Sequence, residues 1–144
     1  MYNFFLHAHS GLRWLVLLLA VVVIIKSLIG LFGGGAYKKL DNILAASFVG
    51  TMHLQLLIGL ILYIFLSPIT TSAFSNVSEA MSNPAIRYWF VEHITVMILA
   101  VVAAQVGRSI SKKSDDSLVK FRFQTIFFTI AFFLMMTRIP WDRV

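Results

Sequence analysis

The stretch LVLLLAVVVII, residues 15–25, forms the centre of an apolar segment that runs from about Leu12 to Phe32. Three further apolar stretches follow it, at about Ile43–Leu66, Tyr88–Val106 and Phe123–Met136. A bilayer core about 30 Å thick requires about 20 apolar residues of helix, with about 17–25 tolerated, and the first three stretches meet that length. The fourth meets it when Arg138 and Trp141 lie in the interface.

The composition of the whole chain excludes several classes of protein. Its 144 residues are 59% apolar and only 12% charged, whereas an ordinary soluble domain is about 25% charged. A water-facing surface of normal polarity cannot be built from so few charges, and disorder requires low hydrophobicity. Cysteine is absent, which excludes disulfides, iron–sulfur clusters and thiolate nucleophiles.

The four apolar stretches predict an all-α fold. Hydrocarbon offers no hydrogen-bond partners to the backbone, so spanning segments must be helices or closed barrels. A barrel strand alternates with a period of two, and residues 15–25 show no such alternation. We therefore predict one domain over residues 1–144, a four-helix transmembrane bundle. Its helices are expected at about 5–32, 43–67, 86–108 and 120–140.

The connections between these stretches predict the orientation of the bundle. Residues 33–42 and 107–122 must lie on the same side of the membrane, and together they hold seven Lys or Arg residues. Residues 67–87, expected to form a polar loop, hold only Arg87. The positive-inside rule places the two basic connections in the cytoplasm, so both termini face outward. The net charge of +6 then reflects membrane-facing loops and no nucleic-acid partner.

The ionisable residues within the predicted spans are few, and such residues usually mark a functional site. All four histidines lie in or beside spans, as His7, His9, His53 and His93. At 1.5 Å per helical residue, His53 and His93 are predicted to lie about 15 and 22 Å from the cytoplasmic ends of their helices. Two arginines, Arg13 and Arg138, are predicted to share a level one or two turns farther out.

This arrangement is typical of a b-type haem site. Its iron takes two neutral imidazoles from facing helices, and the predicted ligands are His53 and His93. The propionates of the haem require fixed cations in low dielectric, a role that Arg13 and Arg138 suit. Gly50 lies one turn before His53 and leaves room for a flat ring, while His9 shares a helix face with Arg13 and leaves another ligand pairing open.

Other interpretations of the same residues stay open. The histidines and arginines can form interhelical hydrogen bonds in a structural or assembly subunit without redox function. His7 and His9 can bind copper or zinc, with Met side chains, only if their segment is extended, since alternate helical residues point apart. Glu92 can orient the bundle or relay protons. No substrate-pocket motif is recognisable, which favours a redox carrier or subunit over a stand-alone enzyme.

Five blocks of sequence resemble a family of small four-helix bacterial membrane proteins that are catalogued as cytochrome b-like. The blocks are HSGLRWLVLLL (9–19), MHLQLLIGLILY (52–63), VEHITVMILA (91–100), GRSISKK (107–113) and RIPW (138–141). The resemblance covers nearly the whole chain. It implies one haem b in a multi-pass protein of the bacterial inner membrane, with His53 and His93 as ligands and His9 as the next candidate. The expected partners are lipid, a quinone or quinol, and other redox subunits or a second copy of the chain.

Overall fold

The structure, a computed structural model, describes residues 1–143, and in that part of the chain every regular element is helical. The predicted all-α fold is therefore confirmed. Four helical segments are long and apolar enough to cross a membrane. They are α1 (Tyr2–Gly33), α2 (Lys39–Ile61) with its π-helical continuation η1 (Leu62–Leu66), α6 (His93–Lys113) with the preceding α5 (Pro84–Arg87) and π-helical η2 (Tyr88–Glu92), and α7 (Ser117–Arg138).

The segment expected to be a polar loop, residues 67–87, is largely helical, and that expectation is wrong. It forms α3 (Pro68–Ser75), α4 (Val77–Ser82) and the beginning of the third long segment. Pro68 and Pro84 occupy the first turns of α3 and α5, where the missing N–H breaks no helical hydrogen bond. Asn76 and Asn83 cap α4 and α5 by accepting hydrogen bonds from backbone N–H groups, as short polar side chains do at helix starts.

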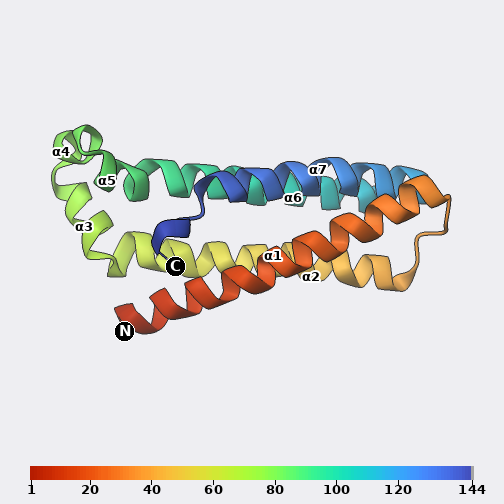
Figure 1. The fold of residues 1–144 in the computed structure, drawn as a ribbon, viewed down its shortest axis with the longest axis horizontal. Helices are drawn as coiled ribbons and strands as arrows, with labels where there is room; N and C mark the ends of the chain where they lie inside the picture. Colours follow the sequence, from red (N-terminus) through yellow and green to blue (C-terminus); the bar gives the residue numbers. More distant parts are fainter. Residues whose placement is uncertain (144) are drawn as a thin grey trace.

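The four long helices lie side by side along the length of the molecule (Figure 1). α1 packs against α2 and α7, and α6 packs against the same two helices. Small residues allow this close approach: Ala20, Ala45, Ala100, Ala104 and Ala131 have no exposed surface. At Gly107 an added Cβ would lie 2.4 Å from Cβ of Phe127 on α7, so only glycine permits this separation of α6 and α7. Small residues at helix contacts are typical of membrane proteins.

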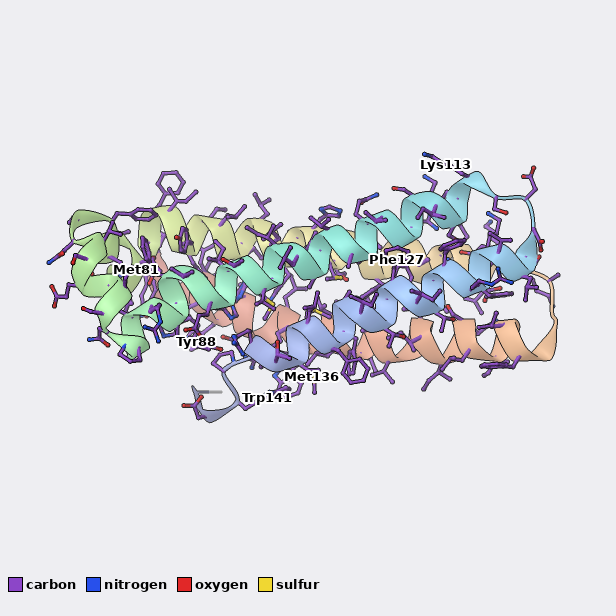
Figure 2. All side chains as sticks on the ribbon, turned by 90° about the horizontal axis from the view of Figure 1, so that it is seen from above. Met81, Tyr88, Lys113, Phe127, Met136 and Trp141 are labelled. Carbon is purple, nitrogen blue, oxygen red and sulfur yellow. The ribbon has the colours of Figure 1, made fainter. Side chains whose placement is uncertain are left out.

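The outward faces of the helices are covered by large apolar side chains. Leu18, Ile29 and Phe133 are each at least 60% exposed, and side chains of this kind extend along the whole bundle (Figure 2). An apolar surface that continuous is incompatible with a solvated monomer. Together with four helices that are long and apolar enough to cross a membrane, it is consistent with a membrane protein.

The two ends of the molecule differ in character. The end that carries Lys113 holds the two short connections, residues 34–38 and 114–116 (Figure 2). There, Lys26 Nζ lies 2.9 Å from Oδ1 of Asp41, whose side chain is 2% exposed and also accepts from the backbone N–H of Lys38. The opposite end holds α3, α4 and α5, the beginning of α1 and the end of α7 (Figure 1).

A buried polar cluster near the basic end is held together around Gln124, which is 1% exposed. Its Oε1 accepts from the Ser27 hydroxyl at 3.1 Å, and its Nε2 donates to the hydroxyls of Tyr37 and Ser111. The cluster links α1, α6, α7 and the first connection. Burial raises the pKa of Tyr37 above its usual range, so the phenol stays neutral and suits its role as an acceptor.

Candidate functional site

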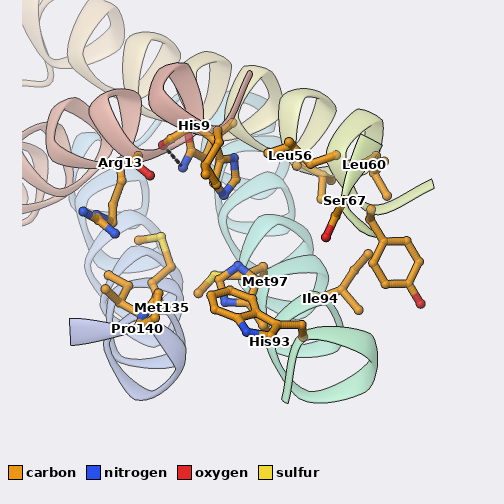
Figure 3. Close-up of a pocket in the computed structure, with 18 of the residues that line it drawn as sticks. His9, Arg13, Leu56, Leu60, Ser67, His93, Ile94, Met97, Met135 and Pro140 are labelled. Atoms are coloured by element: carbon orange, nitrogen blue, oxygen red, sulfur yellow. Dashed lines mark hydrogen bonds between the residues drawn. The ribbon is translucent and has the colours of Figure 1, made fainter. Parts of the chain in front are cut away.

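A cavity of about 400 Å³, partly open to the outside, lies toward the end of the molecule that carries α3–α5. It is enclosed by α1, α2 with η1, η2, α6 and the end of α7, and most of its lining is apolar. Figure 3 shows His9 and His93 on opposite sides of it, with Arg13 and Met135 at one edge and Leu56 and Ile94 toward the other. Its volume is in the range of ordinary ligand sites.

His9 reaches the cavity from the second turn of α1. Arg13 lies four residues later on the same helix face and lines the same cavity, as helical spacing requires. The Nδ1 atom of His9 is buried and has no hydrogen-bond partner among the described residues. Across the cavity, Gly59 of α2 meets the ring edge-on: a Cβ added there would lie 3.0 Å from Cε1 of His9. Gly59 therefore provides the space that the imidazole occupies.

His93 is the first residue of α6, and its ring is oriented by the end of α7. Its Nδ1 lies 2.8 Å from the carbonyl oxygen of Arg138. That carbonyl can only accept, so Nδ1 carries the proton and Nε2 of the neutral ring keeps its lone pair. α7 ends at Arg138, two residues before Pro140. The carbonyl is one of the last of its helix, which have no intrahelical donor, so it is free to accept from His93.

The two imidazoles lie edge to face, at a separation that also suits a shared metal ion. Their ring centroids are 6.4 Å apart, and their planes are inclined at 69°. A metal ion bound by two imidazole nitrogens at about 2.0–2.1 Å each separates the ring centroids by about 6 Å. A metal-ligating histidine almost always donates its second N–H to a carbonyl, carboxylate or water, which His93 does. The geometry of His9 and His93 therefore fits a bis-imidazole site.

Two further polar groups in the cavity wall lack a partner. The Nε atom of Arg13 and Oε1 of Gln55 are buried without a hydrogen bond among the described residues. Nε2 of Gln55 donates to the backbone carbonyl of His9 at 2.8 Å, which ties α2 to α1 beside the ligand position. No ion pair in the described part of the chain involves Arg13. Arg13 is half-buried, and its guanidinium carbon lies 5.1 Å from the centre of the Trp14 ring. Its charge has no anionic partner among the described residues and suits an anionic group of a bound ligand.

The sequence predicted that the guanidinium of Arg138 meets a haem propionate, but the structure places it beside Glu92. Its Nε lies 3.7 Å from Oε2 of Glu92, and Glu92 also accepts from Arg87 at 3.3 Å. Its carbonyl oxygen accepts from both His93 and the hydroxyl of Tyr88. Arg138 therefore holds His93 through its main chain, while its guanidinium already has an anionic partner in the protein.

The structure does not bring His53 and His93 together. His53 lies on the exposed face of α2, where its Nε2 is 2.8 Å from Oε1 of Gln105 on α6. Gln105 is twelve residues from His93 on α6, about 18 Å at 1.5 Å per residue. Gly50 lies beside His53 on the exposed face, with nothing within 4 Å of an added Cβ. The predicted depths of about 15 and 22 Å were measured from helix ends taken as level, whereas the contact of His53 with Gln105 places His53 about 18 Å from His93 along α6.

The remaining sequence candidates occupy separate positions. α1 is a continuous helix from Tyr2, so His7 is exposed while His9 faces the cavity, and the two cannot chelate one ion. Met97 and Met135 line the cavity, and Met136 does not. Within the described residues no three His, Cys, Asp or Glu side chains are grouped as a metal cluster.

Two features of the site carry no clear signal in the sequence. The π-helical segments η1 and η2 lie opposite each other, and Tyr63 in η1 donates its hydroxyl to the carbonyl of Phe90 in η2 at 2.9 Å. η2 directly precedes His93, and single π turns are frequent at functional sites. Gln55 and Gly59 both lie within MHLQLLIGLILY. They are four residues apart, so a helix places them on one face of α2. That spacing alone does not show that the face lines a cavity.

Comparison of the chain with family models, curated proteins and solved structures found no match. The functional argument therefore depends on the geometry of the cavity.

Proposed function

We propose that the chain is a four-helix transmembrane bundle that binds one haem b between His9 and His93 and carries single electrons within a membrane. The observation that carries the proposal is the pair of facing imidazoles in an apolar cavity, 6.4 Å between centroids, with one ring oriented by a backbone carbonyl. His9 takes the place that the sequence assigned to His53. The resemblance to cytochrome b-like proteins agrees with this function and with the cofactor.

The number of protein ligands favours haem over a bare metal ion. Zinc sites use three or four protein ligands, whereas the cavity offers two imidazoles and the described residues hold no third His, Cys, Asp or Glu grouped with them. Haem would supply the remaining ligands of its iron from its own ring, so His9 and His93 would be sufficient as protein ligands. The apolar lining, and the absence of an ion pair to Arg13 in the described part of the chain, suit a flat apolar ring with anionic substituents.

Bound haem supplies one-electron chemistry at its iron. The residues of this chain fix the conditions for it. Arg138 holds His93 in the tautomer that presents Nε2, and Gly59 leaves His9 its position opposite. Arg13 places a positive charge beside the cavity, which favours the state with one more electron. The mostly apolar lining of the cavity would also influence the potential.

The proposed setting is the bacterial inner membrane, with both termini in the periplasm and the basic connections in the cytoplasm. The seven basic residues of those connections support the orientation. A periplasmic reporter fused after Val144 is expected to be active, and a cytoplasmic reporter at the same place inactive. The opposite result would reverse the orientation. Quinol, other redox subunits and a second copy of the chain are the proposed electron partners.

The test is a reduced-minus-oxidised absorption spectrum of the purified protein, together with the ratio of haem to protein. We expect the spectrum of a low-spin b-type haem at one haem per chain. A protein that purifies folded but takes up no haem, even when haemin is added, would overturn the proposal in favour of a structural subunit. Bound copper or zinc in place of haem would favour the metal-handling alternative.

A further inference from the structure

A second hollow lies on the outside of the molecule, between α2 and α6 and near the basic end. It encloses about 460 Å³ and is lined on one side by Gly50 and His53 and on the other by residues of α6 from Gln105 to Lys113. It is separate from the cavity of His9 and His93, and the two have no lining residue in common. The residues that line it have no part in the proposed haem site.

The mouth of this groove is strongly basic. Arg108, Lys112 and Lys113 line it, and no acidic residue does. Within the described residues, none of the ion pairs involves these three side chains. Arg108 donates one hydrogen bond to the amide oxygen of Asn42 at 2.8 Å, which fixes its guanidinium between the helices. Three cations therefore converge on one opening without a protein anion.

The inner part of the groove is polar although it belongs to a spanning segment. Nε2 of His53 donates to Oε1 of Gln105, which can only accept, and Gln105 donates to the hydroxyl of Ser109 at 3.0 Å. Among the described residues, the second N–H of Gln105 and the hydroxyl proton of Ser109 have no acceptor, so both are available as donors. Gln105 lies eight residues before Lys113, about 12 Å along the helix. Such donors are costly when they face only hydrocarbon.

We propose that this groove binds one anionic glycerophospholipid. Its phosphate would be met by Arg108, Lys112 and Lys113, and its ester carbonyls, which lie deeper in a membrane, by Gln105 and Ser109. Basic pockets between transmembrane helices bind anionic headgroups in this way. His53 acts as a positioning residue, because its hydrogen bond orients Gln105. Along α6, Lys112 and Lys113 lie at the mouth, Arg108 and Ser109 lie about one turn inside, and Gln105 lies about two turns inside. The charged groups therefore lie nearer the mouth than the innermost neutral donor, as the phosphate of such a lipid lies nearer the membrane surface than its ester carbonyls.

The experiment measures lipid retention by native mass spectrometry of the whole protein in detergent, titrated with phosphatidylglycerol or phosphatidylcholine. Wild type is expected to bind one phosphatidylglycerol about tenfold more tightly than phosphatidylcholine, a difference that salt reduces. The triple variant Arg108→Gln, Lys112→Gln, Lys113→Gln is expected to lose that preference. The matched control Lys38→Gln, Lys39→Gln, Arg122→Gln removes the same charge outside the groove and is expected to keep it.

A further variant tests the inner donors. Gln105→Leu is expected to lower the affinity for phosphatidylglycerol several-fold while leaving its salt dependence unchanged, because no charge is removed. Equal binding of phosphatidylglycerol by wild type and the groove triple variant would overturn the proposal. So would an equal loss in the control triple variant, or binding of glycerol phosphate as tight as that of the intact lipid. None of these outcomes depends on haem binding.

Discussion

The two buried polar clusters of the protein differ in how completely their hydrogen bonds are made. Around Gln124, near the basic end, both the amide oxygen and the amide nitrogen have partners on other elements. Around Gln55, in the cavity, the nitrogen has a partner and the oxygen has none, and His9 and Arg13 beside it also carry unpartnered atoms. Gln124 therefore has hydrogen-bond partners for both its amide oxygen and its amide nitrogen, whereas Gln55 leaves its amide oxygen without a partner.

The difference separates structural polar groups from ligand-binding ones. Buried polar atoms in native proteins are nearly always hydrogen-bonded, and the exceptions call for an explanation such as a missing ligand. The Gln124 cluster is complete and needs nothing more. The cavity has three buried atoms without a partner, Nδ1 of His9, Nε of Arg13 and Oε1 of Gln55, and the proposed haem would supply a metal for the imidazole and an anion for the arginine.

The largest expected effect comes from substituting His9 or His93, the two histidines that line the cavity. His9→Ala and His93→Ala should each abolish the low-spin haem spectrum, because each removes one axial ligand. His53→Ala is the matched control and should retain the full spectrum, since His53 lies on the exposed face of α2. The measurement is the absorption spectrum of each purified variant. Loss of haem in His53→Ala alone would restore the pairing predicted from the sequence.

Two glycines of α2 differ in the same way: Gly59 lies beside His9 in the cavity, and Gly50 lies on the exposed face. Gly59→Ala would place Cβ 3.0 Å from Cε1 of His9, displacing the ring, and should weaken haem binding about tenfold, as displaced metal-site geometry does. Gly50→Ala meets nothing within 4 Å and should leave the affinity unchanged. Haemin titration of the apoproteins measures both. Equal affinities in the two variants would show that the position of His9 is unimportant.

Substitution of Gln124 and of Gln55 shows how much each polar cluster contributes to the free energy of unfolding. Gln124→Leu removes the partner of Ser27, Tyr37 and Ser111 and should lower the free energy of unfolding by about 1–3 kcal/mol. Gln55→Leu breaks one interhelical hydrogen bond, which should cost about 0.6 kcal/mol in a membrane protein. Unfolding of the apoproteins in mixed micelles with increasing SDS measures both. A larger loss in Gln55→Leu would mean that the cavity wall, too, is mainly structural.

The smallest expected effect is electrostatic. Arg13→Gln should lower the haem midpoint potential by about 20–60 mV, on the scale where 59 mV is a tenfold change for one electron. The sign follows because the lost cation had favoured the reduced state. Arg138→Gln should shift the potential less, because Glu92 already lies beside that guanidinium. Redox titration of the two variants measures both shifts of the midpoint potential. Equal shifts would place both arginines at the haem.

The sequence was sufficient for the helical class and for the approximate positions of the four spans, because hydropathy and length determine them. It also placed His93, His9 and Arg13 among the candidates, since ionisable residues within spans are rare. It did not determine which histidines face each other. That choice depends on the relative height of α2 and α6 and on the rotation of each helix, neither of which appears in hydropathy.

The role of Arg138 was also beyond the sequence. Its side chain is charged and was therefore expected to meet an anionic ligand, whereas the structure uses its backbone carbonyl to hold His93. RIPW does contain a signal for this, since Pro140 ends α7 and leaves carbonyls without donors. Which donor such a carbonyl meets is decided by packing between α6 and α7.

The central claim is that His9 and His93 are the two axial ligands of one haem. Electron paramagnetic resonance of the oxidised wild-type protein tests it most directly, because the spectrum reports both the spin state and the mutual inclination of the ligand planes. The account predicts a low-spin signal of strong anisotropy, since the imidazole planes are inclined at 69°. A high-spin signal from haem with a single imidazole, or a low-spin signal that persists unchanged in His9→Ala, would contradict it.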